Sequence, residues 1–438
     1  MVMRRREFLR TAGATLISTT GLGLLGRGRA EAAATELSGK VVFWDQIGPD
    51  DYARKAQADF QDAFKKAYPK VNMEMTLFGY GDYLDKLRLA LRGNDPLDVV
   101  RLHFSWIPEI VNGGYLVELD PAKLGLSKES FTPGAVQIGT RQGKFLTIPS
   151  SNECMILIYN KGLFKAAGMD PEKAPDTWEQ VAEYSKQIKD KTGKFGYGMV
   201  ARLNHGNTGF RILPVMWGYG GSMLDELDPT PQNKEIRINR EGTTKALDLY
   251  HRMYAIDKSV SPTALTDAQP EVSTQFLNGQ VAMIIAHAND ASDAKRKNPD
   301  LNVGATLMPK GPVRRAAVLG GFEMGLLKTS KNPGAAMGLI KMFLDPEWLP
   351  RIIGDNSNPG TKEALRSKAQ AEREQRNPYH KPYKEMLAYG VVQPQVPQLA
   401  TIWNEVIPTM LQEAITGKKT AKQAADDAAK ALAELMKA

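Results

Sequence analysis

The polar residues Ser150 to Glu153 come directly before the apolar stretch Met155 to Tyr159. That stretch is rich in β-branched and aromatic side chains and predicts a buried strand. A carboxylate at the start of a buried strand is unfavourable unless it is hydrogen-bonded or faces a solvated cleft. Glu153 is therefore either an acid that binds a polar ligand or part of a polar turn that leads into the strand. The residue types alone leave both interpretations open.

Further polar and aromatic side chains stand at the ends of three predicted strands, 40–45, 71–77 and 98–102. Predicted amphipathic helices alternate with these strands, which indicates a parallel α/β sheet. Ligands of such sheets bind beyond the carboxyl ends of the strands. This rule places Trp44, Asp45, residues 78–80 and residues 103–106 near one edge of a cleft. Asp45 could instead cap a helix, and His103 could be a hydrogen-bonded core residue.

The chain contains no pattern of a known catalytic centre. Its five histidines, at positions 103, 205, 251, 287 and 380, do not have the spacing of a metal site. No nucleophile elbow, dinucleotide-binding glycine motif or P-loop occurs. The two carboxylates of a glycosidase are not found at an informative spacing either. We therefore expect no enzymatic activity, no cofactor and no bound metal.

The composition is that of a globular protein, with 42% hydrophobic and 24% charged residues. A length of 438 residues predicts two lobes or domains. The formal net charge is +8, and residues 1–34 contribute six arginines and two glutamates to it. The net charge of the chain after residue 34 is too small to indicate that the protein binds nucleic acid or a membrane surface. Cys154, the single cysteine, cannot form a disulfide within the chain and is predicted to be a small core residue.

The N-terminus has the pattern of an export signal. A basic start is followed by the apolar and small residues 11–26, which are too few to span a bilayer, and by small residues at 30–34 that suit signal cleavage. Arg5-Arg6-Glu7-Phe8-Leu9-Arg10 resembles the twin-arginine motif. Residues 1–34 are thus predicted to be a twin-arginine signal peptide, with a general secretory signal as the alternative. The mature protein is expected in the periplasm, without stable membrane insertion.

The segment from Tyr159 to Phe164 resembles the Y-N-K-x-L-F motif of the extracellular solute-binding proteins that serve carbohydrate ABC importers, a family that includes maltose-binding protein. Four further patterns of that family follow one another in order over residues 36–435. They are a G-x-L-x-x-L segment within 110–121, a T-W helix start within 176–180, an F-x-x-G-x-x-A-M segment at 276–283 and an S-K-N-P helix start at 330–336. Each pattern is weak alone, and their order makes the resemblance specific.

The resemblance implies positions for several ligand contacts. The acid six residues before the tyrosine of the first motif lies in the family's ligand cleft, and here it is Glu153. In the family, the residues that follow the strand of the F-x-x-G-x-x-A-M segment face the ligand, which here indicates His287, Ala288 and Asn289. The family often has a tryptophan where this chain has Asn289. Trp403 falls on the position of a stacking tryptophan. Residues 204–211, read as a polar glycine-rich loop, and 217–221 correspond to contacts from the second lobe.

A carbohydrate binder needs planar polar groups and flat aromatic rings, because sugars expose both hydroxyls and apolar C–H faces. Each tryptophan could also be an ordinary core residue. The candidate ligand-binding residues are Trp44, Asp45, Tyr80, His103, Trp106, Glu153, Asn207, Arg211, Trp217, His287, Asn289, Gly321 and Trp403.

The expected fold is α/β, of the two-lobed periplasmic-binding-protein type II, with mixed sheets flanked by helices and about three hinge crossovers, near Ser151, Ala305 and Phe343. The N-terminal lobe is expected to comprise residues 36–152 with 306–343, and the C-terminal lobe 153–305 with 344–438. The expected function is binding of a sugar, oligosaccharide or sugar alcohol between the lobes of a monomer, and its delivery to the membrane permease of an ABC importer.

Two alternatives remain open from the sequence. A binder of a non-sugar solute, such as a glycerophosphodiester or a peptide, would share the fold, although a phosphate would call for clustered arginines or helix N-termini in the cleft. Arg211 is the one obvious arginine there. A carbohydrate-active enzyme is the second alternative, and the missing catalytic motifs disfavour it.

Overall fold

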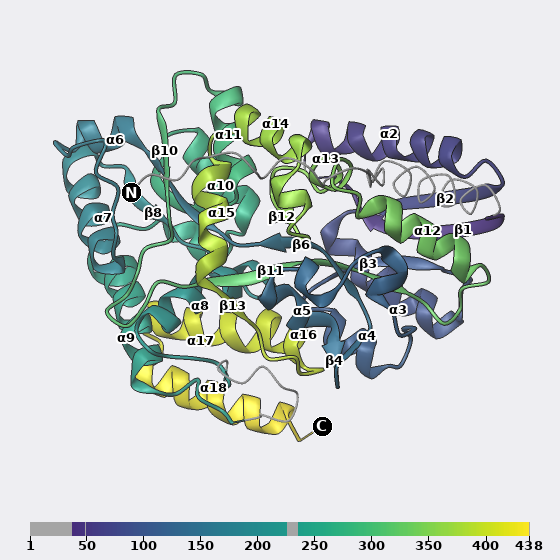
Figure 1. Cartoon of the computed structure of the whole chain (residues 1–438). Coiled ribbons are helices and arrows are strands. Elements are labelled where there is room, and N and C mark those ends of the chain that lie inside the picture. The colour runs from purple at the N-terminus through teal and green to yellow at the C-terminus, as the bar shows by residue number, and fades with distance from the viewer. Residues whose placement is uncertain (1–36, 49, 226–234, 438) are drawn as a thin grey trace, which may run out of the picture.

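The computed structural model describes residues 37–48, 50–225 and 235–437, which form a mixed α/β architecture built on two main sheets (Figure 1). The expected signal peptide lies outside the described residues. Within the described ranges, no helix is both long enough and apolar enough to cross a membrane.

Seven of the described strands form the first sheet, in the order β12-β6-β11-β3-β1-β2, with β13 beside β11. Strands β1, β2 and β3 are parallel, whereas β11 is antiparallel to both β3 and β6. The bounds are β1 Gly39–Gln46, β2 Val71–Phe78, β3 Val99–His103, β6 Ile148–Glu153, β11 Ala317–Leu326, β12 Asn358–Pro359 and β13 Gly390–Val392. The three N-terminal strands predicted from the sequence, and their parallel arrangement, are confirmed.

Helix α2 shows why the helices that cover this sheet form where they do. The carboxylate of Asp50 caps it by accepting a hydrogen bond from the backbone N–H of Ala53 at 2.8 Å. The ring of Phe60 packs edge to face on Phe343 of the neighbouring helix at 5.7 Å, and Phe343 meets Phe43 of β1 edge to face at 5.8 Å. Full burial of each such ring contributes about 1.5–3 kcal/mol. The covering helices are α2 Asp51–Ala67, α3 Tyr80–Gly93, α4 Ile107–Asn112, α5 Pro133–Gly139, α12 Pro333–Phe343 and α13 Leu349–Ile352.

The second sheet has the strand order β10-β7-β9-β8. Its strands are β7 Ile156–Asn160, β8 Phe195–Gly198, β9 Val281–Ala286 and β10 Val303–Thr306, so the strand predicted over Met155 to Tyr159 is confirmed. Thr177 caps one of its helices, since its hydroxyl accepts from the N–H of Gln180 at 3.1 Å. The helices are α6 Lys161–Ala166, α7 Trp178–Thr192, α9 Glu241–His251, α10 Gln269–Leu277 and α11 Ala288–Lys297.

The polar residues from Ser150 to Glu153 end strand β6, so the entry turn that the sequence left open as an alternative does not form. One local prediction was wrong, because residues 207–211 begin helix α8, Asn207–Gly218, rather than a loop. The helix forms despite Pro214 in its interior, because its apolar residues are buried on all sides, and this burial outweighs the hydrogen bond that proline removes.

The last part of the chain is helical. The described helices are α14 Lys368–Arg376, α15 His380–Glu385, α16 Leu399–Thr401, a π-helical turn Ile402–Val406, α17 Ile407–Ile415 and α18 Ala421–Leu435. Helix α18 packs on α17 and α9 (Figure 1). This packing buries one face of α18, with Ala424, Ala428 and Leu432 at helical spacing.

Candidate functional site

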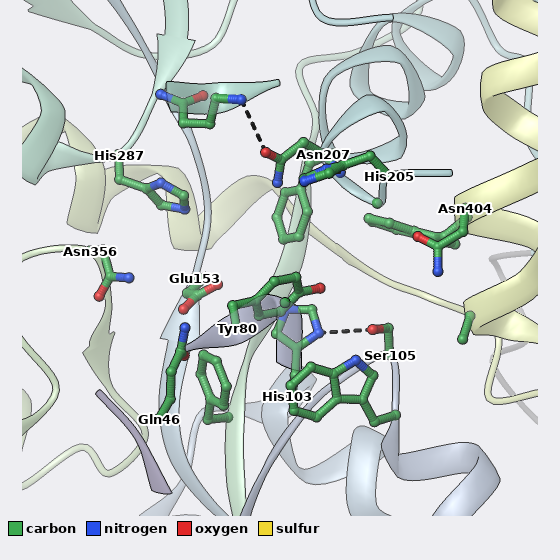
Figure 2. Close-up of a pocket in the computed structure, with 18 of the residues that line it drawn as sticks. Gln46, Tyr80, His103, Ser105, Glu153, His205, Asn207, His287, Asn356 and Asn404 are labelled. Carbon is green, nitrogen blue, oxygen red and sulfur yellow. Dashed lines mark hydrogen bonds between the residues drawn. The ribbon is translucent and has the colours of Figure 1, made fainter. Parts of the chain in front are cut away.

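A pocket of about 390 Å³ lies where the two sheets meet. Gln46, His103 and Glu153 end strands β1, β3 and β6 and reach it from the first sheet. His287 follows β9 and reaches it from the second sheet (Figure 2). The pocket therefore collects the carboxyl ends of strands from both sheets, as ligand sites of α/β proteins do.

Seven of the thirteen candidate residues line this pocket, and they come from both halves of the chain. They are Tyr80, His103, Trp106, Glu153, Asn207, His287 and Trp403. The remaining six, namely Trp44, Asp45, Arg211, Trp217, Asn289 and Gly321, lie away from it.

Three of those six serve the packing of the first sheet. Asp45 is fully buried and pairs with Arg101 at 3.2 Å. Trp44 packs its ring on Phe78 at a centroid distance of 4.7 Å. Gly321 has φ +128°, and a Cβ there would come within 2.0 Å of the carbonyl oxygen of Ser151, so its role is close strand approach.

Of the other three, Trp217 and Arg211 belong to the interior of the second half, and Asn289 is half-buried. Trp217 is fully buried in α8, and Arg211 is 1% exposed and donates to the carbonyl oxygen of Asn207 at 2.9 Å. Asn289 is in the first turn of α11. His287, the residue before that helix, lines the pocket, whereas Asn289 does not. None of the three is included in the site that we consider below.

Aromatic rings from the first sheet and from the starts of helices α3 and α4 form one wall of the pocket. Tyr80 stacks on Trp106 with centroids 5.3 Å apart and an interplanar angle of 29°. The imidazole of His103 lies edge-on to Tyr80 at 5.1 Å and to Phe322 at 5.1 Å. Such rings offer flat apolar faces that suit the C–H faces of a ligand.

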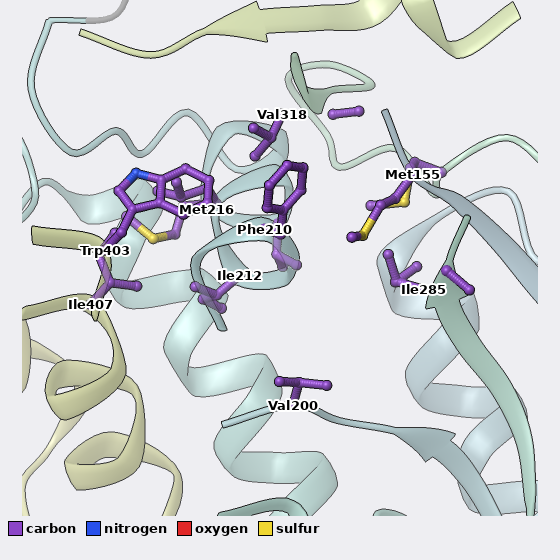
Figure 3. Packing of buried hydrophobic residues seen from close by; sticks show 14 of the residues in the cluster. Met155, Val200, Phe210, Ile212, Met216, Ile285, Val318, Trp403 and Ile407 are labelled. Atoms are coloured by element: carbon purple, nitrogen blue, oxygen red, sulfur yellow. The ribbon is translucent and has the colours of Figure 1, made fainter. Parts of the chain in front are cut away.

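A second aromatic group comes from α8 and the π-helical turn. Phe210 and Trp403 meet edge to face at 5.3 Å, and both belong to the buried hydrophobic cluster (Figure 3). Trp403 is 2% exposed, and its indole Nε1 has no hydrogen-bond partner among the described residues. Its ring is therefore fixed by packing rather than by a polar contact.

Glu153 is the single carboxylate among the pocket residues, and it is 5% exposed. The hydroxyl of Ser357 donates to its Oε1 at 3.0 Å. Burial raises the pKa of Glu153, an effect that the nearby charges of His287 and Arg101 and the Ser357 hydrogen bond oppose. No ion pair to Glu153 is found within the part of the chain that the structure describes, so its free oxygen is available to ligand hydroxyls.

Two pocket histidines are uncharged at neutral pH. Burial and the neighbouring Arg101 lower the pKa of His103 to about 3, and its Nδ1 lies 2.8 Å from the hydroxyl of Ser105 (Figure 2). Burial likewise lowers the pKa of His205. Neutral imidazoles both donate and accept hydrogen bonds, as an array of hydroxyls requires.

Side-chain amides complete the polar surface. The Oδ1 of Asn207 accepts from the backbone N–H of Gln269 at 3.1 Å, which joins the first residues of α8 and α10 beside the pocket. Gln46, Asn356 and Asn404 also line it. Figure 2 shows amides at both ends of the pocket with the rings between them.

Thirteen pocket residues are not among the candidate residues, although the sequence placed the ranges 103–106 and 204–211, which contain four of them, at the cleft. They are Gln46, Gly81, Ser105, Met155, His205, Gly206, Phe210, Gln269, Pro270, Phe322, Asn356, Ala400 and Asn404. Most of them stand within three positions of a candidate residue in the sequence. Including the neighbours of each candidate residue would therefore have found them. Gln269, Pro270 and Asn356 had no such signal.

Comparison with known proteins identifies relatives over most of the chain. The family model described as "bacterial extracellular solute-binding protein" matches residues 49–349. The galactooligosaccharide-binding protein of Bacillus subtilis is 25% identical over 425 residues, 94% of each chain. The sn-glycerol-3-phosphate-binding periplasmic protein UgpB of Salmonella typhimurium is 26% identical over 342 residues, 70% of this chain and 71% of UgpB.

A solved structure shows the same fold. The GacH receptor of Streptomyces glaucescens, solved without ligand and in complex with acarbose, superposes with a TM-score of 0.77 at 23% identity. The superposition covers 92% of this chain and 99% of the receptor.

Proposed function

This chain belongs to the bacterial extracellular solute-binding proteins and has the two-lobed fold of periplasmic binding proteins, and from that membership we propose that it binds a carbohydrate and delivers it to the permease of an ABC importer. The family binds solutes outside the cytoplasm. The proposed ligand class is a sugar, an oligosaccharide or a sugar alcohol.

The composition of the pocket carries this proposal. Its lining combines aromatic rings, imidazoles and amides with the single carboxylate Glu153. It contains no lysine and no arginine. Hydroxyl groups can donate to the carboxylate and exchange hydrogen bonds with amides, while the rings cover the apolar face of a sugar.

We further propose that the two sheets are the cores of two lobes that close on the ligand. Strands β7 to β10 all lie between residues 156 and 306, which favours the division expected at residues 152 and 306. Strand β12 pairs with β6, so the segment after Phe343 contributes to both halves. A ligand that contacts both lobes favours the closed form by its additional contacts there. Small-angle scattering with a bound sugar should show compaction, and unchanged dimensions would exclude closure.

Export through the twin-arginine route, cleavage near residue 34, a periplasmic location and a monomeric state complete the proposal. The support for export is the sequence of residues 1–34 together with the family's extracellular role.

A phosphate-containing ligand is the second candidate. The first residues of α8 and α10 line the pocket, and helix N-termini favour anions. The relative UgpB is named for sn-glycerol-3-phosphate. The absence of lysine and arginine from the lining opposes this candidate, because phosphate sites commonly include such a cation.

A thermal-shift screen of the mature protein tests the ligand class. The panel holds mono- and oligosaccharides, sugar alcohols, sn-glycerol 3-phosphate and glycerophosphocholine. A ligand at about 100 times its dissociation constant stabilises the folded state by about 2.7 kcal/mol. We expect a sugar or polyol to stabilise the protein, and Glu153→Gln and Trp403→Ala to remove the shift while exposed Glu118→Gln keeps it. Stabilisation by the phosphates alone would overturn the carbohydrate class.

A further inference from the structure

A buried polar cluster lies behind the pocket wall and is made of Asp355, Arg373 and Asn377. We call it the brace. The three residues are at most 6% exposed, and the pocket lining includes none of them. Buried charges and amides are unfavourable unless they are fully paired. The pairing of the brace therefore indicates which parts of the molecule it holds in place.

One end of the brace holds the partner of Glu153. Arg373 donates through Nη2 to the backbone carbonyl oxygens of Gly354 and Ser357, and through Nε to Asp355 Oδ1 at 3.2 Å. Ser357 in turn donates to Glu153 Oε1 at 3.0 Å. The guanidinium thus fixes the backbone of 354–357, the segment from which Ser357 orients the pocket carboxylate.

The other end holds the start of α11. The Nδ2 of Asn377 donates to Asp355 Oδ2 at 3.1 Å, to the carbonyl oxygen of Ala288 at 3.2 Å and to Ser292 Oγ at 3.3 Å. Ala288 directly follows His287, the residue before α11 that faces the pocket. Tyr383 adds a second connection, since its hydroxyl donates to the carbonyl oxygen of Asn356 and its ring lies 6.1 Å from the imidazole of His287.

Further groups keep the carboxylate of the brace charged. Arg376 donates to Asp355 Oδ1 at 2.6 Å, and Nε2 of His380 is 3.3 Å from the same oxygen. These partners hold the pKa of Asp355 below its usual range despite burial. Arg376 also lies over the ring of Tyr52 in α2 at 3.6 Å, and the N–H of Asp355 donates to Asp50 at 3.1 Å. These two contacts connect the brace to α2, which covers the first sheet.

We propose that Arg373 and Asn377 are positioning residues of the binding site. Through Ser357 and the first turn of α11, they fix the position of Glu153, at the end of strand β6 in the first sheet, relative to His287, which follows strand β9 of the second sheet. Ligand affinity then depends on Asn377 although it touches no ligand. This inference rests on the proposed function only in so far as Glu153 and His287 bind the ligand together.

Asn377→Leu is the variant that tests the proposal, because it keeps the side-chain volume and removes the donors. Asn298→Leu is the matched control, since Asn298 stands at the opposite end of α11 and donates to Leu277 O at 3.2 Å. With the sugar that gives the largest shift in the thermal screen, a double-mutant cycle measures the coupling of each variant to His287→Ala. We expect about fivefold non-additivity in Kd for Asn377→Leu and additive effects for Asn298→Leu. Additive effects for both would overturn the proposal.

A second readout needs no ligand. The imidazole resonance of His287 in the apo protein should shift on Glu153→Gln, because the charges of the two groups interact. In the Asn377→Leu variant, we expect Glu153→Gln to change the His287 resonance by less than it does in the wild type. In the Asn298→Leu variant, we expect the full change. An undiminished shift in Asn377→Leu would refute the positioning role. If no sugar of the panel binds, the carbohydrate proposal fails. The resonance measurement still tests whether Asn377 positions His287 relative to Glu153, because it needs no ligand.

Discussion

The indole ring of Trp403 lies directly against the backbone of Gly209. A Cβ atom at Gly209 would stand 2.9 Å from Cε3 of the indole and 3.0 Å from Cδ2. Real Cβ atoms do not approach other atoms so closely, so a larger residue at 209 must displace the ring. Trp403 therefore depends on a glycine 194 positions earlier in the chain for its place in the pocket wall.

Gly209→Ala is expected to weaken sugar binding because the methyl group pushes Trp403 out of its position. The effect on Kd should be comparable with that of Trp403→Ala, measured by titration calorimetry with a sugar identified in the thermal screen.

The matched control is Gly334→Ala in α12, where the nearest atom would be a methyl group of Leu37 at 3.6 Å. This substitution should leave Kd unchanged and raise stability by up to about 1 kcal/mol, because alanine favours a helix over glycine. Normal binding by Gly209→Ala would show that the ring's position is unimportant to the ligand.

The buried pair of Asp45 and Arg101 makes a prediction about stability. Arg101 Nη1 donates to Asp45 Oδ1 at 3.2 Å, and Nε and Nη2 donate to Ser150 and Ser151. Arg101→Met leaves a fully buried carboxylate without its cation and should destabilise the protein by about 3–5 kcal/mol in urea unfolding.

The double variant Asp45→Asn, Arg101→Met should recover part of that loss, since no charge then remains unpaired. Lys55→Met, which removes an exposed ion pair with Asp59, should change stability by less than about 1 kcal/mol. If Arg101→Met and Lys55→Met lowered the free energy of unfolding equally, burial of the Asp45–Arg101 pair would not explain its importance.

Local patterns in the sequence were sufficient to predict the elements, because caps and periodic burial act over short distances. Thr177 caps the helix whose start the T-W pattern predicts, and β7 occupies the predicted apolar stretch. Helix α8 was missed because its first residues are polar and glycine-rich, while burial of later residues decides its conformation.

The pocket was only half predictable for a related reason. Position after a strand brought His103 to the pocket, and the family resemblance brought Glu153 there. Position alone could not tell which side of the sheet Trp44 or Asp45 faces. Gln269 and Asn356 reach the pocket through contacts far apart in the sequence, such as that between Gln269 and Asn207. No local pattern encodes such contacts.

The route of export can be tested without the ligand. Residues 1–34 fused to a folded fluorescent protein should deliver fluorescence to the periplasm of a bacterial host, because the twin-arginine route carries folded cargo. Arg5→Lys with Arg6→Lys should retain the fluorescence in the cytoplasm. Unchanged periplasmic fluorescence after this double substitution would point away from the twin-arginine route.

Glu323 predicts an unusual dependence of stability on pH. It is 1% exposed in β11, the hydroxyl of Thr147 donates to its Oε2, and its Oε1 has no hydrogen-bond partner among the described residues. Burial raises the pKa of Glu323 to about 8, although the Thr147 hydrogen bond and the charge of Arg141 oppose the shift. Above the ordinary pKa of about 4.3 the unfolded chain loses this proton while the folded protein keeps it.

The folded state therefore binds more protons than the unfolded state between about pH 4.3 and the folded pKa of about 8. The contribution of Glu323 to stability falls as pH rises through this window, by up to about 1.4 kcal/mol per pH unit, and is constant above it. Glu323→Gln removes this slope, so the difference in Tm between variant and wild type should grow from pH 5 to pH 8 in favour of the variant. Glu118→Gln, which alters an exposed acid paired with Lys144, provides the control and should show no comparable trend. A difference between Glu323→Gln and wild type that stays constant across this range would mean that Glu323 is already ionised in the folded protein at pH 5.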